Sequence, residues 1–292
     1  MRFSGLFVMM INRSKDRINK TERNELMGIN YFYNHYFKPQ DVIRQNRVFS
    51  QAHIVLATLI VCAIVTIMAV QKRKQNPYFS QKILIVLGVL MLLLELFRIV
   101  WRTHYYGMHW TNFRFDWCNQ ICMVLPFIAM FRIEKLYPYV DVAAFLGGVA
   151  VLIYPLWVFY DYAGIHVMSV QSMVSHGLMV TIALSMPMSS KQGYHRSLKQ
   201  MGKRLIGMGI ILAVAFWAST FFNANYLLMR NARGIPIISA IAAPYYWLVV
   251  LPILIFGMDF ATRLLRQFDF WMANHRPYPP EKRKVAFLHG RV

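Results

Sequence analysis

Acidic residues and cysteines are both scarce in this chain. Its 292 residues include 12 Asp and Glu against 32 Lys and Arg, and three cysteines, Cys62, Cys118 and Cys122. Three scattered thiols inside apolar segments form neither a disulfide framework nor a zinc site. The sequence also lacks a Walker loop, a dinucleotide-binding glycine fingerprint and a metalloprotease His-Glu pattern. We therefore expect no metal and no cofactor.

Uncharged apolar runs, by contrast, are long. Hydrophobic residues make up 57% of the chain, and residues 54–70 and 83–94 carry no charged side chain. Seven runs approach the length of about 20 residues that crosses a hydrocarbon layer of ~30 Å. They are residues 50–70, 80–101, 114–131, 139–158, 167–187, 205–226 and 244–262. The sequence predicts an all-α polytopic membrane protein, with an interfacial arm at 1–49, one seven-span domain at 50–262 and a tail at 263–292.

Basic residues gather in the loops on one side of the predicted bundle. Those loops and the tail hold eighteen Lys and Arg, whereas the short loops on the other side hold four. Basic loops stay in the cytoplasm, so we predict a multi-pass protein of the cell membrane with a cytoplasmic C-terminus. Anionic lipids of the inner leaflet account for the formal charge of +20 without any nucleic acid. Membrane lipids are the expected partners.

The N-terminal arm does not follow this charge pattern. Residues 1–49 carry nine Lys and Arg, yet an odd number of spans places them outside the cytoplasm. Two interpretations remain open: the arm lies on the outer surface as an amphipathic, aromatic belt, or the number of spans is not seven. We expect the first, because long arms obey the charge rule less strictly. The arm is also a candidate for binding a protein partner.

Polar residues inside the spans fall at one level of the predicted bundle. Because alternate spans run in opposite directions, they all come to lie in the same half of the membrane. Polar groups in lipid are costly and usually mark a site or a water-filled cavity. We expect a chamber open toward the outer leaflet, and almost no polar groups in the opposite half. The residues are His53, Glu95, Arg98, Cys118, His176, Asn223, Asn225, Tyr226, Tyr245 and Tyr246.

The start of the third span is the stretch richest in reactive groups. Asp116, Cys118, Asn119 and Cys122 crowd its first turns, and the two cysteines share a helix face. A thiol at a helix N-terminus is stabilised as the nucleophilic thiolate. An ionised Asp116 opposes this effect, or serves as an N-cap. The alternative is that the cysteines simply fill space in a buried helix.

His176 lies well inside the fifth span. It is either a general base that activates a thiol or a structural histidine bonded to a neighbouring helix. Cys118 is about one turn into its span, whereas His176 is nearer two and a half turns into its own. At a rise of 1.5 Å per residue, this predicts a difference in depth of roughly 10 Å between the two side chains.

The remaining candidates also have two interpretations each. Glu95 and Arg98 either neutralise each other or leave Arg98 to grip a lipid phosphate. His53 is an interfacial residue or a wall of the chamber, and Tyr246 belongs to an aromatic belt or contacts the substrate. The same choice, between packing and substrate contact, applies to Asn225 and Tyr226.

Several of these stretches together resemble one family. They are residues 49–53 (FSQAH), 115–119 (FDWCN), 175–177 (SHG), 225–229 (NYLLM) and 243–247 (APYYW). In order and spacing, from about residue 47 to residue 262, the chain resembles the YwaF-like integral membrane proteins of bacteria. That family is related to eukaryotic transmembrane acyltransferases that remodel phospholipids.

The resemblance implies a thioester mechanism. The cysteine that matches Cys118 would attack an acyl ester of one lipid, the histidine that matches His176 would assist, and the acyl group would pass to the hydroxyl of a second lipid. Asn119, Asn225 or Tyr226 would donate to the oxyanion. The chain departs from the family pattern at Asp116, where the family has a histidine two residues before its cysteine.

We therefore expect an intramembrane lipid acyltransferase with Cys118 as nucleophile and His176 as base. The rival hypothesis, favoured by Asp116, is a non-enzymatic membrane subunit that binds a lipid or a protein partner. A small-solute transporter is a weaker third interpretation, because the sequence shows no inverted repeat. The residues expected to line the substrate site are His53, Glu95, Arg98, Asp116, Asn119, Asn225, Tyr226 and Tyr246.

Overall fold

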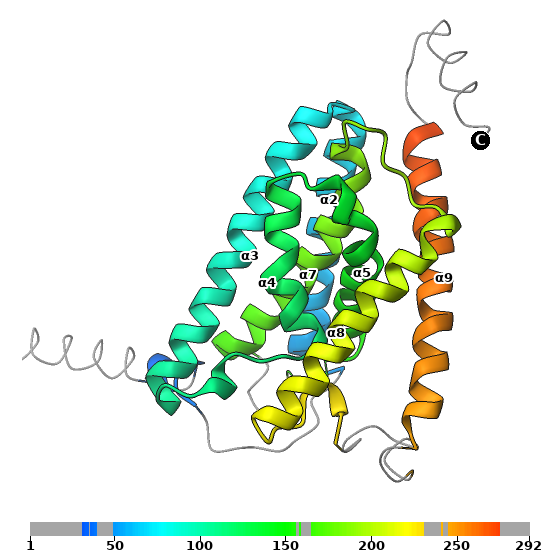
Figure 1. The fold of residues 1–292 in the computed structure, drawn as a ribbon. Coiled ribbons are helices and arrows are strands. Elements are labelled where there is room, and N and C mark those ends of the chain that lie inside the picture. Colours follow the sequence, from blue (N-terminus) through cyan, green and yellow to red (C-terminus); the bar gives the residue numbers. More distant parts are fainter. Residues whose placement is uncertain are drawn as a thin grey trace, which may run out of the picture.

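In the described part of the chain, the structure, a computed structural model, has seven α-helices as its main elements (Figure 1). The structure describes residues 31–34, 36–39, 49–155, 158, 165–230, 241 and 245–274. Within this part of the chain there is no β-strand, so the predicted all-α class is confirmed. The helices are α2 (Gln51–Lys74), α3 (Pro77–Tyr106), α4 (Trp117–Met130), α5 (Tyr137–Ile153), α7 (Val167–Ser189), α8 (Met201–Phe221) and α9 (Trp247–Asn274).

Six of these helices are long and apolar enough to cross a membrane, and α4 is a shorter apolar helix. This confirms a multi-pass helical membrane protein. With 14 residues, α4 is about 21 Å long at a rise of 1.5 Å per residue, which is less than the ~30 Å of a hydrocarbon layer. The segment before α4 contains the short 3₁₀-helix η1 (Trp110–Asn112).

Local sequence signals account for both ends of α2 and for the start of α3. Ser50 caps the start of α2 by accepting a hydrogen bond from the His53 backbone N–H at 3.4 Å. Gln75 ends α2 in the left-handed conformation, with φ 46°. Asn76 then caps α3 by accepting from the Tyr78 N–H at 2.9 Å, and Pro77 supplies the fixed φ that suits a first helical position.

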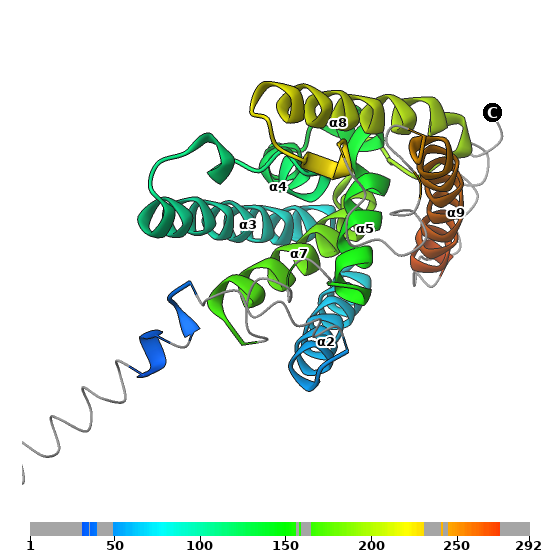
Figure 2. The same cartoon turned by 90° about the horizontal axis from the view of Figure 1, so that it is seen from below.

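The helix α7 lies at the centre of the bundle. It packs against α2, α3, α4 and α5, which Figure 2 shows in a view from one end. Glycines permit the closest approaches: a Cβ on Gly177 of α7 would lie 2.4 Å from Ile60 of α2, and one on Gly148 of α5 would lie 2.7 Å from the His176 carbonyl of α7. Small residues at helix crossings are typical of membrane bundles.

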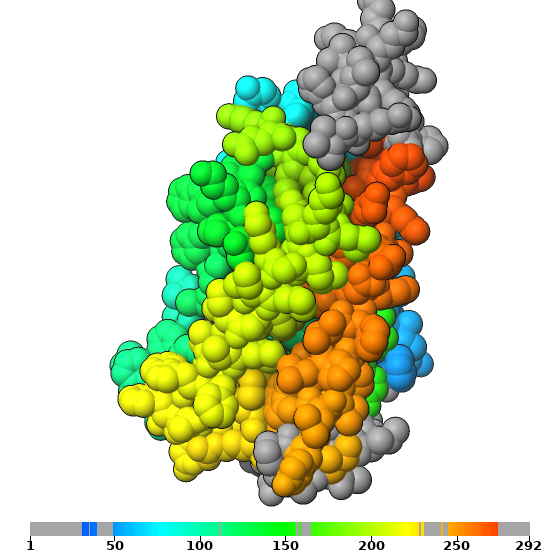
Figure 3. All heavy atoms as spheres, turned by 45° about the vertical axis from the view of Figure 1, so that its right-hand side comes forward, coloured from blue at the N-terminus to red at the C-terminus, as the bar shows by residue number. Residues whose placement is uncertain are grey.

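Helices α8 and α9 complete one side of the molecule. The two helices lie beside each other on the surface in Figure 3. Both pack against α5, and α8 also contacts α4. Helix α9 continues to Asn274, well past residue 262, where we expected the cytoplasmic tail to begin. The residues of the tail after 274 lie outside the described part of the chain.

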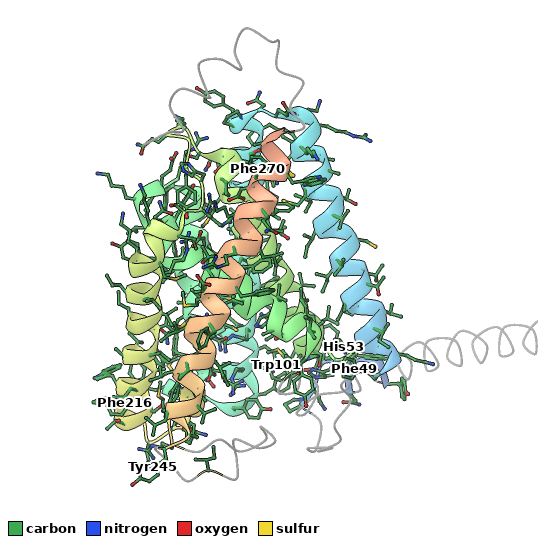
Figure 4. The ribbon with its side chains drawn as sticks, turned by 90° about the vertical axis from the view of Figure 1, so that its right-hand side faces the viewer. Phe49, His53, Trp101, Phe216, Tyr245 and Phe270 are labelled. Carbon is green, nitrogen blue, oxygen red and sulfur yellow. The ribbon has the colours of Figure 1, made fainter. Side chains whose placement is uncertain are left out.

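The two ends of the bundle differ in the residues they present, and we name them after one residue each. The His53 end contains the starts of α2, α4, α7 and α9. Figure 4 labels His53, Trp101 and Tyr245 at this end. The opposite Lys72 end contains the finishes of α2 and α9, and Phe270 lies close to it in the same view.

The few described residues of the N-terminal arm contact the His53 end. Trp101 of α3 donates from its indole N–H to the Phe37 carbonyl at 2.9 Å. The Tyr33 and Tyr105 hydroxyls lie 2.6 Å apart, and His166 Nε2 lies 3.0 Å from the Lys38 carbonyl. The arm thus leaves the bundle opposite the basic Lys72 end. Residues 1–30 and 40–48 lie outside the described part of the chain.

Candidate functional site

A buried ion pair on α3 forms one wall of the candidate site. The Glu95 carboxylate accepts two hydrogen bonds from Arg98, from Nε at 3.0 Å and from Nη2 at 2.5 Å. Arg98 also donates to the Asn112 carbonyl at 3.2 Å, and all three residues are buried. These contacts match the mutual neutralisation of the two charges. They use three of the N–H donors of Arg98. The binding of a lipid phosphate by Arg98 remains a prediction.

Both cysteines of α4 face the inside of the bundle. Cys122 is buried, and it lies near enough to the Glu95 carboxylate for the two groups to interact electrostatically. Cys118 is half-buried, and its thiol lies 3.9 Å from the Gly147 carbonyl of α5. The shared helix face of the two cysteines thus points toward α3 and α5.

His176 of α7 has one ring nitrogen engaged and one without a partner. Nδ1 lies 2.6 Å from the Ser172 carbonyl one turn earlier. Because a carbonyl oxygen can only accept, Nδ1 carries the proton, and Nε2 of the neutral ring then holds a lone pair. Nε2 is buried and has no hydrogen-bond partner among the described residues. The ring also interacts electrostatically with Glu95.

Two adjacent glycines of α5 show that Cys118 and His176 lie at similar depth. A Cβ on Gly147 would be 3.3 Å from the Cys118 sulfur, and one on Gly148 would be 2.7 Å from the His176 carbonyl. Neighbouring residues of a helix differ by a rise of about 1.5 Å. The expected difference of roughly 10 Å therefore does not separate the Cys118 sulfur from the His176 backbone. Within the described residues, no hydrogen bond joins the Cys118 thiol to His176 Nε2.

Asp116, two residues before the Cys118 thiol, uses both carboxylate oxygens in contacts with other residues. Its Oδ1 accepts a hydrogen bond from the Leu227 backbone N–H at 3.0 Å, and Oδ2 lies 3.3 Å from Arg114. It occupies the N-cap position of α4 without a capping hydrogen bond from its side chain. The carboxylate therefore anchors the 3₁₀ turn η4 (Tyr226–Leu228) to the start of α4. Asn119 is half-buried on the first turn of the same helix.

Tyr226 is buried beside the start of α4, with its ring edge against Phe115 at 5.6 Å between centroids. Its hydroxyl has no hydrogen-bond partner among the described residues. Burial, followed by the nearby Asp116 carboxylate, raises the pKa of this hydroxyl, so it stays a proton donor at neutral pH. Asn225 instead accepts from the Arg230 backbone N–H at 2.8 Å, which stabilises the same turn.

His53 and Tyr246 lie at the His53 end but make different contacts. Nε2 of His53 lies 2.9 Å from the Leu152 carbonyl, and Nδ1 accepts from the Phe49 N–H at 3.1 Å. This histidine therefore joins the start of α2 to the end of α5. Tyr246 is buried beside Trp247, and its hydroxyl has no partner within the described ranges. In the part of the chain that the structure describes, no group of three His, Cys, Asp or Glu side chains could hold a metal ion.

Comparison with known proteins places this arrangement in a family of membrane proteins. The profile of the TMEM164 family matches residues 48–262, which include every candidate residue. The chain belongs to the TMEM164 family. Neither a curated protein nor a solved structure matches it. The match does not extend to the YwaF-like proteins or to acyltransferases, so that resemblance stays a prediction.

This member of the TMEM164 family also has a buried charge cluster at the Lys72 end. Asp141 of α5 is fully buried and accepts from Arg196 Nε at 3.0 Å, from Arg204 Nε at 3.4 Å and from the Tyr194 hydroxyl at 2.7 Å. Arg196 also donates to Asp269 of α9 at 2.6 Å. The expectation that this half of the bundle holds almost no polar groups is therefore wrong.

The sequence concealed this cluster because its members come from different elements. Asp141 is the only charged residue of α5, and that isolation in an apolar helix was an available signal. Arg196 precedes α8, and the rule for basic loops counts it as a surface charge although it is buried. Burial and the Asp141 carboxylate raise the pKa of Tyr194, which keeps its proton and donates it in the hydrogen bond to Asp141.

Proposed function

We propose that this protein transfers acyl chains between membrane lipids through a cysteine thioester. The observation that carries the proposal is Nε2 of His176, which is buried and has no hydrogen-bond partner among the described residues. The Ser172 carbonyl accepts a hydrogen bond from Nδ1 and so leaves the lone pair on Nε2. A buried polar atom without a partner is costly, and such atoms are concentrated at functional sites. A base with a fixed tautomer is what the activation of a thiol requires.

Cys118 is the nucleophile in this proposal, and two features support that choice over Cys122. Cys118 is half-buried, whereas Cys122 is buried, so a lipid ester reaches Cys118 more easily. Cys118 also lies in the first turn of α4, where backbone N–H groups have no partner within the helix. The side chain of Asp116 does not cap them. The local dipole at this position favours a thiolate, whereas burial and the nearby Asp116 carboxylate oppose it.

The reaction has two balanced steps. His176 Nε2 takes the proton of the Cys118 thiol, and the sulfur attacks the ester carbonyl of a donor lipid. The collapse of the tetrahedral intermediate breaks the ester C–O bond, and the lysolipid oxygen leaves with the proton from His176. In the second step, His176 takes the hydroxyl proton of the acceptor lipid, whose oxygen attacks the thioester. The acyl group leaves on the acceptor, and the sulfur regains its proton.

Nearby groups supply the electrostatic part of this chemistry. The Glu95 carboxylate, which already interacts with the His176 ring, stabilises the imidazolium that forms in each step. In this proposal, the first-turn N–H groups of α4 donate to the oxyanion beside Cys118. The Tyr226 hydroxyl, protonated and adjacent to the same turn, is a second donor. Donors of this kind typically contribute a rate factor of about 10²–10³ each.

One observation favours a second function, in which the protein binds lipid or a partner without chemistry. Asp116 stands where the resembled family has a histidine, and its carboxylate is used structurally by Leu227 and Arg114. In this case the bundle keeps its interior polar groups for binding alone. The two functions differ in what they demand of the thiol, because binding does not require a nucleophile.

Acyl labelling of the thiol distinguishes the two functions. The purified full chain is incubated in lipid vesicles with a phospholipid that carries an alkyne-tagged acyl chain. Acyl transfer predicts a tagged protein whose label hydroxylamine removes, and which Cys118→Ala lacks. Cys122→Ala and Cys62→Ala should retain the label. Absence of any label while lysolipid is released from the donor, or a label that survives in Cys118→Ala, would refute the thioester at Cys118 and leave the binding function.

A further inference from the structure

A groove opens between α2 and α9 near the Lys72 end, away from the candidate site. It encloses about 610 Å³, within the range of about 300–1,000 Å³ typical of small-molecule sites. Leu184 of α7 belongs to its lining, and α7 also packs against α2. Most of the other lining side chains are apolar: Ile64, Val65, Met68, Ala69, Phe268 and Met272.

The length of the groove corresponds to one leaflet of a membrane. Along α2 it extends from Ile64 to Gln75, which is about 16 Å at a rise of 1.5 Å per residue. The hydrocarbon core is ~30 Å thick, so the groove covers about half of it. A transmembrane helix of a second copy would need a contact surface along the full thickness. An acyl chain, which belongs to one leaflet, fits the observed length.

Basic side chains line the groove at the Lys72 end. Lys72 Nζ lies 3.1 Å from the centroid of the Trp271 ring, so this contact joins α2 to α9 across the groove. Arg73 also lines the groove and is exposed. None of the lining residues is acidic. The neighbouring Asp269 of α9 is bound to Arg196 on another side of the helix. The mouth of the groove is therefore positively charged.

We propose that this groove binds one anionic glycerophospholipid from the leaflet at the Lys72 end. An acyl chain lies on Leu184 between α2 and α9, and the headgroup phosphate meets Lys72 and Arg73. The combination of a one-leaflet apolar channel and a basic mouth matches both parts of such a lipid. The site is separate from His176 and does not depend on the proposed acyl transfer.

Photocrosslinking tests the proposal with the full chain in vesicles of phosphatidylcholine. The probes are phosphatidylglycerol and phosphatidylcholine, each with a diazirine on one acyl chain, and mass spectrometry maps the crosslinked residues. We expect crosslinks at residues 64–69 and 268–272, with a clear preference for the anionic probe. Lys72→Gln with Arg73→Gln should lower that preference by about thirtyfold, because each basic side chain near an anionic headgroup contributes about a fivefold preference.

Two control variants separate the site from general attraction of the basic protein to lipid. Lys74→Gln with Lys82→Gln removes the same charge near the same end without touching the lining, and it should leave the preference unchanged. Ala69→Trp fills the channel and should remove the crosslinks of both probes while the gel-filtration profile stays that of the native protein. Equal labelling by the two probes, or mapped crosslinks that Ala69→Trp does not change, would overturn the proposal.

Discussion

The two polar regions of this bundle use buried charge in opposite ways. At the Lys72 end, Asp141 and Asp269 stand against Arg196 and Arg204, so the charges of the cluster neutralise one another. Nearer the His53 end, the ion pair of Glu95 and Arg98 lies close to a histidine whose Nε2 has no partner in the described structure. The first arrangement holds helices together, and the second retains a group that can accept a proton.

This difference gives each region its own expected response to mutation. Loss of a fully paired charge should cost stability, because it leaves its partners buried and uncompensated. Loss of an unpaired base should cost activity with little change in stability, because the fold does not use its lone pair. The following predictions test that contrast, beginning with the largest effect.

The largest effect is expected at His176. His176→Asn keeps a donor for the Ser172 carbonyl but removes Nε2, so acyl transfer should fall by about 10²–10⁴-fold, the usual contribution of a general base. Turnover of the alkyne-tagged lipid measures the rate, and the melting temperature should stay near that of the native protein. His53→Asn is the matched control, because both ring nitrogens of His53 bind backbone groups. It should lower stability and slow transfer much less. Equal rates for His176→Asn and the native protein would remove the proposed base.

The next effect concerns the paired cluster. Asp141→Asn removes the carboxylate that compensates Arg196 and Arg204, so we expect the free energy of unfolding to fall by about 3–5 kcal/mol. Titration with a denaturing detergent, followed by circular dichroism, measures this change. A loss below about 1 kcal/mol would show that the cluster does not hold the helices together.

A substitution at the contact between α5 and α7 should have an intermediate effect on stability. A Cβ on Gly148 would lie 2.6 Å from Val180 and 2.7 Å from the His176 carbonyl, so Gly148→Ala has to push α5 away from α7. We expect a loss of about 1–3 kcal/mol in the free energy of unfolding and slower transfer. Gly209→Ala is the control, since nothing lies within 4 Å of its added Cβ. If the two variants unfold alike, the close approach of α5 to α7 is not present in the membrane.

The smallest effect is expected for an ion pair outside both clusters. Asp259 and Arg263 of α9 pair at 2.7 Å, but both side chains are exposed. An exposed pair at this helical spacing contributes about 0.3–0.5 kcal/mol, so Asp259→Asn should barely change unfolding. The same substitution at Asp141 and at Asp259 thus compares a buried with an exposed carboxylate directly. A similar loss at both positions would contradict the distinction between them.

Much of the fold could be predicted from the pattern of apolar residues. Six long spans and the shorter α4 occupy the segments that the sequence predicted, because an uncharged run of this length has to form a helix to satisfy its backbone in lipid. The boundaries were less predictable, as α9 shows by continuing to Asn274. Its last turns carry polar residues that the sequence pattern assigns to a tail.

The candidate residues could be chosen from the sequence, but their partners could not. The position of Glu95 three residues before Arg98 was enough to suggest their ion pair, because both lie on one helix. The contact of Asp116 with Leu227 and that of His53 with Leu152 join segments far apart in the chain. Such contacts depend on how each helix is rotated and tilted, which hydropathy does not encode.

The sequence by itself determined a membrane bundle and membership of the TMEM164 family, because length, apolarity and motif order are properties of the chain. Only the tertiary structure decided which buried polar groups have hydrogen-bond partners among the described residues and which have none. Adjacent glycines of α5 bring Cys118 and His176 to one depth, and the fold collects Asp141, Arg196 and Arg204 from separate elements. The physical reason is that a buried polar group takes its character from partners on other helices, and packing alone selects them.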